Sequence, residues 1–225
     1  MYRSRSLART NSRSPDVLAR IVAVAPSLAD AVQSAGGTLA SHAAGGHEVT
    51  VVTVFEELAR DEQVARIAEL LGLHGLVGVG LPVAGARGYE GDEHAGSRDD
   101  DDALAAAGAA VAVTIGRLEP DVLLAPLGLT GHVDAQIIDR ALAALSADAL
   151  RWVDLPYALA RTPGAPLGAG QVVAVPISGQ LAAKRAACEL LPGADASRLV
   201  SFAESEGARL GAGGPVELLL RTVSA

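Results

Sequence analysis

The pattern of hydrophobic and polar residues divides the chain into two kinds of segment, which alternate along it. Short valine-rich runs bounded by glycine or proline predict buried β-strands at 19–26, 47–55, 75–82 and 120–127. Between and after these runs, apolar residues recur at helical spacing in 30–44, 60–72, 101–118 and 133–147. Strands that alternate with helices predict an α/β fold with a Rossmann-like, doubly wound, mostly parallel sheet.

The last third of the chain has a less regular pattern. It predicts a strand at 171–177, a helix at 180–191 and a final strand at 215–223. We therefore expect one α/β domain, with its core at 18–150 and a small irregular extension at 151–225.

The segment 1–17 is basic and rich in serine. It lacks the apolar stretch of a secretory signal, so we expect a disordered tail rather than a leader.

Composition narrows the classes of partner. The 225 residues carry a net charge of −8, which argues against a nucleic-acid-binding or anionic-membrane surface. No apolar run approaches the roughly 18 residues of a membrane span. A single cysteine, Cys188, fits a reducing compartment, so we expect a cytoplasmic protein. The alanine-rich helices would permit self-association into a homo-oligomer.

Ligands of open α/β sheets bind beyond the carboxyl ends of the strands. Four segments meet that condition here: Ser27–Asp30, Glu56–Glu57, the loop 83–102, and 128–135. None of them carries a GxGxxG dinucleotide fingerprint, a phosphate-binding P-loop or a GxSxG nucleophile elbow. The pattern therefore favours a small-molecule ligand and disfavours the common nucleotide and serine-hydrolase sites.

Three stretches resemble the PIG-L/LmbE-like family of deacetylases. They read "IVAVAPSLADAVQSAGGTLASHAAGGHEVTVVTV", "PDVLLAPLGLTGHVDA" and "WVDLPYA". The family includes N-acetylglucosaminyl-phosphatidylinositol deacetylases and the deacetylase and amidase of mycothiol metabolism. The resemblance implies the same α/β fold that the strand and helix pattern predicts.

The resemblance also implies where a zinc site would lie. Members carry Pro-His-Pro-Asp-Asp after the first strand and His-x-Asp-His after the fourth, and both motifs contribute zinc ligands. Here Ser27 and Ala135 stand at the two zinc-binding histidines, and Ala29 stands at the general base. Asp30, the third ligand position, remains, together with His132 and Asp134 of the second motif. A catalytic zinc needs three protein ligands, so we expect no metal and no cofactor.

Three hypotheses follow. In the first, the protein is a metal-independent enzyme that uses His132, Asp134 and Asp30 as acid–base groups on a small metabolite. The residues expected to bind that metabolite are Ser27, Glu56, Arg87 and Trp152. In the second, the protein is a non-catalytic pseudo-deacetylase that serves as a binding module. In the third, it is a zinc deacetylase or amidase whose replacement ligands are Glu93 or His94 of the 83–102 loop.

Overall fold

The structure is a computed structural model that describes residues 18–55, 62–96, 98, 101–129, 131–145, 148–161 and 164–221. Seven strands form one sheet in the order β3-β2-β1-β4-β5-β7-β6. Their bounds are β1 Arg20–Ala25, β2 Glu48–Thr53, β3 Gly75–Gly78, β4 Val122–Pro126, β5 Leu150–Trp152, β6 Gln171–Pro176 and β7 Val216–Arg221. The first five strands are parallel, whereas β7 pairs antiparallel with both β5 and β6. The predicted doubly wound, mostly parallel sheet is confirmed.

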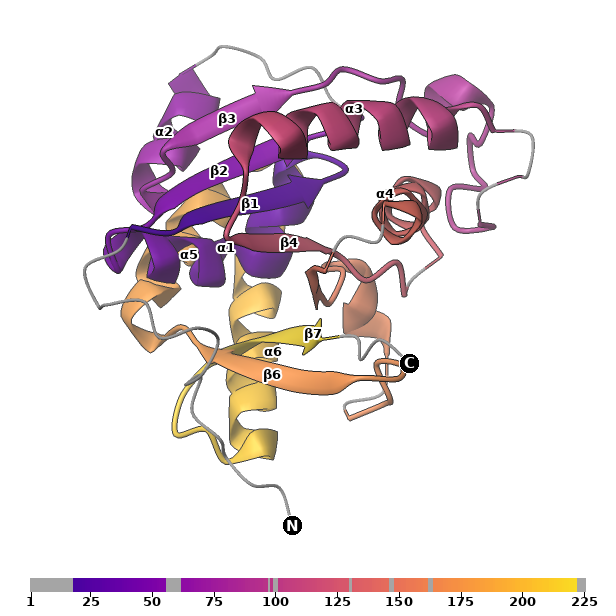
Figure 1. The fold of residues 1–225 in the computed structure, drawn as a ribbon. Helices are drawn as coiled ribbons and strands as arrows, with labels where there is room; N and C mark the ends of the chain where they lie inside the picture. Colours follow the sequence, from indigo (N-terminus) through magenta and orange to yellow (C-terminus); the bar gives the residue numbers. More distant parts are fainter. Residues whose placement is uncertain are drawn as a thin grey trace.

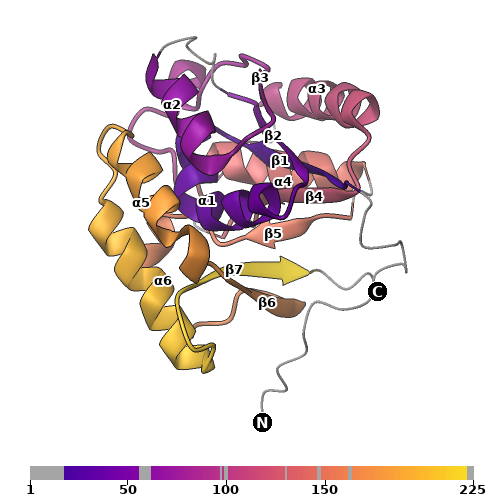
Figure 2. The ribbon, with the colours of Figure 1, turned by 90° about the vertical axis from the view of Figure 1, so that its left-hand side faces the viewer.

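Helices cover both faces of the sheet (Figures 1 and 2). Their bounds are α1 Leu28–Ala44, α2 Glu62–Leu71, α3 Ala103–Leu118, α4 Val133–Ala144, α5 Leu181–Glu189 and α6 Ala196–Leu210. α1, α2, α5 and α6 lie on one face, and α3 and α4 lie on the other. Short 3-10 turns at Gly85–Arg87, Tyr157–Ala160 and Ser178–Gln180 complete the described elements.

The residues of β1 show why the sheet is buried on both faces. Ile21 and Ala23 point into the core beneath α1 and α5, whereas Val22 and Val24 point into the core beneath α3 and α4. Because successive side chains of a strand point to opposite faces, a doubly covered strand must be apolar at every position. The continuous apolar run in the sequence therefore predicted this strand correctly.

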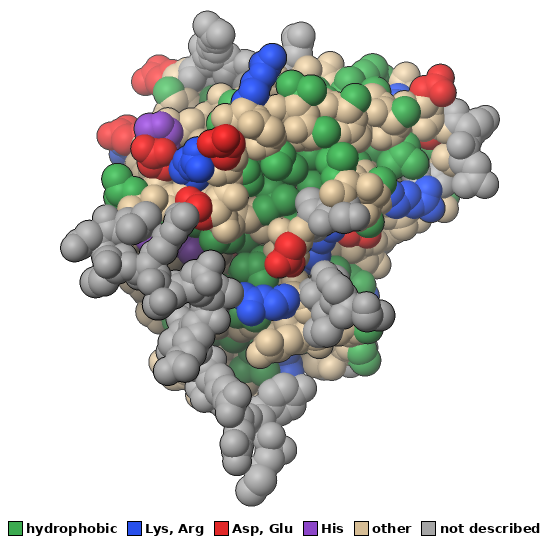
Figure 3. Space-filling model, viewed as in Figure 1, with side chains coloured by type: hydrophobic (Ala, Val, Ile, Leu, Met, Phe, Trp, Pro, Cys, Tyr) green, Lys and Arg blue, Asp and Glu red, His purple; other side chains and the backbone are tan. Residues whose placement is uncertain are grey.

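The alanine-rich helix α3 leaves an apolar surface. Arg117 is the charged residue among its sixteen residues, and Val113 is 53% exposed. Hydrophobic side chains gather around this helix on the face shown in Figure 3. The expectation of a homo-oligomer rests on this surface. Among the described residues, no helix is both long and apolar enough to cross a membrane.

Two elements escaped the sequence prediction, β5 and α6. β5 has three residues, which is too short to show a strand period. α6 has a polar composition, although Asp195 at its start and Gly211 at its end are typical cap residues. The predicted tail 1–17 lies outside the described residues, as do the last two residues of the predicted strand 215–223.

Two adjacent glycines of α1 differ in the space around them. A Cβ atom on Gly37 would lie 2.8–2.9 Å from three side-chain atoms of Ile177, whereas one on Gly36 would lie 3.6 Å or more from its neighbours. We expect Gly37→Ala to lower the free energy of unfolding by about 1–3 kcal/mol through overpacking. Gly36→Ala should be neutral or should raise it by up to about 1 kcal/mol, because alanine favours the helix. Urea denaturation of both variants tests this contrast, and equal midpoints would contradict it.

Candidate functional site

A small pocket lies where β1, β4 and β5 end. Its lining residues are Pro26, Asp30, Ser34, Pro126, His132, Ala135, Trp152, Asp154 and Tyr157. β1 and β4 are neighbours in the sheet, but the helices that follow them cover opposite faces. This is the switch point at which open α/β sheets bind their ligands. The pocket thus lies where the first and last of the four candidate segments were expected to meet.

The N-terminus of α1 forms one wall of the pocket. The hydroxyl of Ser27 accepts the backbone N–H of Asp30 at 3.2 Å, and the Asp30 carboxylate accepts the backbone N–H of Ser27 at 3.1 Å. The Ser27 hydroxyl also donates to the same carboxylate at 2.6 Å. This reciprocal arrangement is a capping box, which satisfies N–H groups that a helix start leaves without a partner. Ser27 is therefore engaged in capping, while Asp30 both caps the helix and lines the pocket.

His132 begins α4 on the opposite wall. Its Nδ1 accepts the backbone N–H of Asp134 at 3.3 Å, so the proton of the neutral ring lies on Nε2. Burial lowers the pKa of His132 and outweighs the charge of Asp134, which raises it. The ring stacks on Tyr157 and meets His94 edge-on, with centroid distances of 5.3 and 5.2 Å. His132 is therefore a neutral hydrogen-bond donor near pH 7.

Asp154 is a buried carboxyl group of the pocket. It is 5% exposed, and its two oxygens accept the backbone N–H groups of Leu127 and Leu129 at 3.1 and 2.9 Å. Burial raises the pKa of Asp154 to about 7, assisted by the charge of Asp30 and opposed by the backbone N–H groups. Asp154 can thus hold or release a proton near neutral pH.

The raised pKa of Asp154 predicts a pH-dependent stability. The folded chain holds this proton more tightly than the unfolded chain, whose carboxyl has a pKa near 3.8. The stabilisation is therefore complete below about pH 4 and is lost as the pH rises through about 7. We expect a loss of about 3 kcal/mol between pH 5 and pH 8, and Asp154→Asn should remove this slope. Urea denaturation between pH 5 and pH 8 measures it, and parallel curves for the parent and Asp154→Asn would contradict it.

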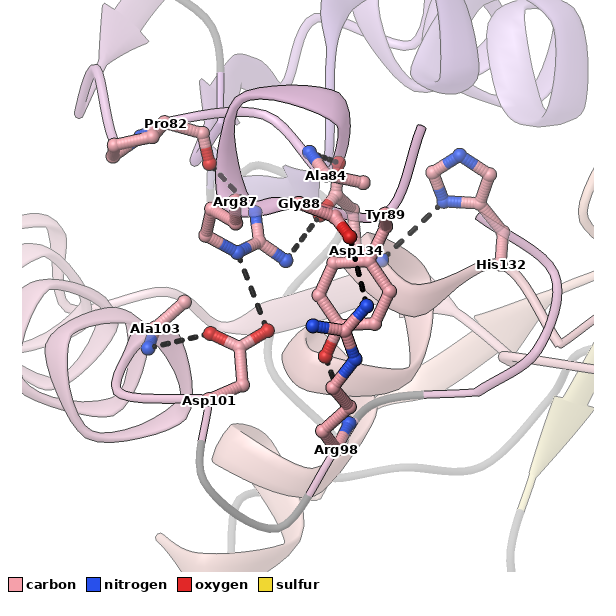
Figure 4. A network of polar contacts seen from close by, with 10 residues as sticks. All are labelled: Pro82, Ala84, Arg87, Gly88, Tyr89, Arg98, Asp101, Ala103, His132 and Asp134. Carbon is pink, nitrogen blue, oxygen red and sulfur yellow. Dashed lines mark hydrogen bonds and ion pairs between the residues drawn. The ribbon is translucent and has the colours of Figure 1, made fainter. Parts of the chain in front are cut away.

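Asp134 and Arg87 belong to a neighbouring network (Figure 4). Arg87 contacts the Asp134 carboxylate at 2.9 Å and that of Asp101 at 3.3 Å, and it donates to the carbonyl of Pro82 at 2.6 Å. Its guanidinium also lies 4.8 Å from the centre of the Phe55 ring.

The second oxygen of Asp134 accepts the N–H of Ala84 at 3.2 Å. Burial opposes ionisation of Asp101, but the N–H of Ala103, the Tyr89 hydroxyl and Arg87 outweigh it and leave its pKa below the ordinary value. The network thus ties the 83–102 loop to the starts of α3 and α4.

The predicted site residues divide into two groups. The structure brings Asp30, His132 and Trp152 to the pocket, with Trp152 fully buried. It directs the carboxylate of Asp134 to Arg87 and Ala84, and neither Asp134 nor Arg87 is among the pocket-lining residues.

Other residues of the site were either not predicted or are not described. The sequence prediction omitted Asp154 and Tyr157, and it named His94 for another role. Asp154 follows β5, so the strand-end rule would have selected it had that strand been predicted. Glu56 lies outside the described residues.

The side chains around the pocket determine whether a metal ion could bind there. Among the described residues, no group of three or more histidine, cysteine, aspartate or glutamate side chains is placed to hold a metal ion. Ser27 is engaged in the capping box, and Ala135, which is 4% exposed, offers no donor side chain.

Several solved structures resemble this chain in fold at low sequence identity. No protein-family model and no curated protein sequence matches it. A crystal structure of an A40926 pseudoaglycone deacetylase is 21% identical, with a TM-score of 0.69, and the match covers 92% of this chain and 99% of that one. A deacetylase of the teicoplanin biosynthesis pathway is 20% identical, with a TM-score of 0.66. That match covers 92% of this chain and 100% of the deacetylase chain. GalB, the 4-carboxy-2-hydroxymuconate hydratase of Pseudomonas putida KT2440, is 17% identical, with a TM-score of 0.59. That match covers 92% of this chain and 98% of the GalB chain.

These similarities extend over nearly the whole length of both partners. The resemblance to the PIG-L/LmbE-like deacetylases is thereby confirmed at the level of the fold. Structures with this fold include deacetylases and a hydratase, so the fold is compatible with more than one reaction.

Proposed function

We propose that this protein is a deacetylase-like enzyme that acts on a small polar metabolite by acid–base chemistry without a metal ion. The observation that supports this proposal is the composition of the pocket, which is lined by two carboxyl groups and an imidazole. The resemblance implies that Ser27 and Ala135 stand at the positions of the family's zinc-binding histidines. Zinc does not fit this set, because the carboxyl and imidazole groups that the structure describes are not placed to hold one ion together. The Asp30 and Asp154 carboxylates instead accept backbone N–H groups.

The pocket supplies groups for proton transfer. Asp154 is the proposed general base or acid, because a group that titrates near neutral pH can both accept and release a proton. His132 offers its Nε2–H as a donor to developing negative charge on the substrate. Asp30 orients the substrate through the carboxylate that also caps α1. Such a set supports a proton transfer, an elimination or a hydration.

The dimensions of the pocket limit the substrate. Its enclosed part has about 10 Å³ of space, which is about enough for one water-sized group. Only a small group of the substrate therefore fits between the lining residues. The rings of Tyr157 and His94 both contact that of His132, and their own centroids lie 4.7 Å apart. Burial and the nearby carboxyl groups raise the pKa of Tyr157 to about 12, so its hydroxyl is a hydrogen-bond donor at neutral pH.

A screen of small polar metabolites against chelator-treated protein tests the proposal, with turnover followed by NMR. We expect turnover by the parent, and a loss of about 100-fold or more in His132→Ala and Asp154→Asn. His74→Ala is the matched control, because His74 is an exposed histidine in the turn before β3. Binding without turnover would favour the non-catalytic pseudo-deacetylase. Equal turnover by the parent and Asp154→Asn would contradict the assigned role.

A further inference from the structure

A second and larger cavity lies on the other side of the segment 152–158. It has about 660 Å³ of free space, part of it open to solvent. Its walls come from α6, from β6 and β7, and from the segment that precedes β6. The lining residues are Val153, Ala158, Arg161, Gly164, Ala165, Pro166, Leu167, Val172, Phe202, Glu206, Arg209, Leu210 and Leu218.

The walls of this cavity are largely apolar. Val153 and Leu218 are at most 6% exposed and form part of the hydrophobic core. Leu167 and Phe202 are half-buried, and Val172 is 38% exposed at the open side. An aliphatic chain placed there would bury its methylene groups, each worth about 0.8 kcal/mol. The cavity therefore favours a ligand with an apolar tail.

The charged groups of the cavity favour an anionic head. Glu206 is 3% exposed and is held by Arg209, whose Nε donates to its carboxylate at 2.8 Å. Arg161 donates to the carbonyl of Pro166 at 2.9 Å, so its guanidinium is fixed over the same cavity. Two guanidinium groups and one carboxylate leave an excess of one positive charge. Arginine recognises carboxylates through paired hydrogen bonds, whereas a cationic ligand would face the excess positive charge.

We propose that this cavity binds a small amphipathic carboxylate, of the class of medium-chain fatty acids. The tail lies against Phe202 and Leu218, and the carboxylate pairs with Arg161 beside the neutralised Glu206. The site is separate from the proposed catalytic pocket, but the two share a wall. Trp152 and Asp154 line the pocket, while Val153 between them lines the cavity.

Trp152, in the shared wall, is the single tryptophan of the chain, so its fluorescence can report ligand binding in the cavity. Decanoate, added below the concentration at which it forms micelles, should change the fluorescence of Trp152 in a saturable, one-to-one manner. Calorimetry of the same titration gives the stoichiometry without reference to any activity. Decyltrimethylammonium, with the same tail and the opposite charge, should bind at least about tenfold more weakly.

Two variants distinguish decanoate binding in this cavity from nonspecific binding of an amphiphile to the protein surface. Arg161→Ala should weaken decanoate binding about tenfold or more, because it removes a charge-assisted hydrogen bond. Arg198→Ala, on the exposed first turn of α6 and away from the cavity, should leave binding unchanged. The proposal is overturned if decanoate does not saturate the parent, if both variants bind alike, or if the cationic amphiphile binds as tightly. None of these results depends on whether the other pocket is catalytic.

Discussion

Replacing Lys184 with alanine should lower the free energy of unfolding by about 3–5 kcal/mol. Lys184 is 1% exposed, and its ammonium group contacts Glu217 at 2.6 Å and the carbonyl of Gln33 at 2.8 Å. The Glu217 carboxylate accepts the backbone N–H groups of Gly37 and Thr38 at 2.9 and 2.6 Å. The alanine variant would leave this carboxylate buried without its counter-charge, which costs far more than the loss of an exposed pair.

Arg185→Ala is the matched control, because Arg185 neighbours Lys184 on α5 and pairs with Glu189 at the surface. Its side chain is 55% exposed, and the expected loss is at most about 0.5 kcal/mol. Urea denaturation at pH 7 measures both variants. If Lys184→Ala unfolded at the same urea concentration as Arg185→Ala, the buried pair would not hold α1, α5 and β7 together in solution.

The second large effect is expected from Arg87→Ala. The side chains of Arg87, Asp101 and Asp134 are 10%, 7% and 6% exposed, so the variant would strand two carboxylates in a buried site. We expect the free energy of unfolding at pH 8 to fall by about 3 kcal/mol or more. A buried carboxyl group destabilises the fold through its charge only while it is ionised, so the loss should be smaller near pH 4 than at pH 8.

Denaturation of Arg87→Ala at pH 4 and pH 8 tests this prediction. Arg66→Ala is its control, because Arg66 pairs with Glu69 at the surface, where the two side chains are 54% and 70% exposed. A destabilisation of Arg87→Ala that did not depend on pH would indicate lost packing against Phe55 rather than stranded charge.

The sequence predicted the order of strands and helices through β4 and α4 because β1, β2 and β4 are almost entirely buried, whereas β3 lies at the edge of the sheet. A strand buried on both faces is largely apolar, so its pattern differs clearly from that of an amphipathic helix. The pattern fails at β5, whose three residues pair with β4 on one side and β7 on the other. A strand that short is specified by its neighbours in the sheet rather than by its own residues.

The sequence predicted part of the candidate site, chiefly through residues that follow a recognisable strand. Asp30 and His132 follow strands that the pattern identifies, and both reach the pocket. The direction of the Asp134 side chain depends on Arg87, which lies 47 residues away in the chain. A contact of that kind arises from the folded arrangement and has no local signal. Asp154 was missed because the strand before it was missed.

Ser27 has a structural role at the start of α1. A serine at a helix start accepts a backbone N–H, and Asp30 three residues later completes the capping box. The wall of the pocket is thus stabilised by hydrogen bonds within α1. Ala135, on the opposite wall, is buried beside His132 and leaves the imidazole as the polar group on that side.

Zinc binding tests most directly whether the pocket works without a metal ion. Untagged protein, purified without chelators and re-equilibrated with zinc, would be analysed for metal content and by calorimetry. The reference is the triple variant Ser27→His, Ala29→Asp, Ala135→His, which restores the family's zinc ligands and general base and should bind one zinc ion per chain. We predict no stoichiometric zinc in the parent, whereas one zinc ion per parent chain would contradict the account and favour a hydrolase with ligands other than those considered.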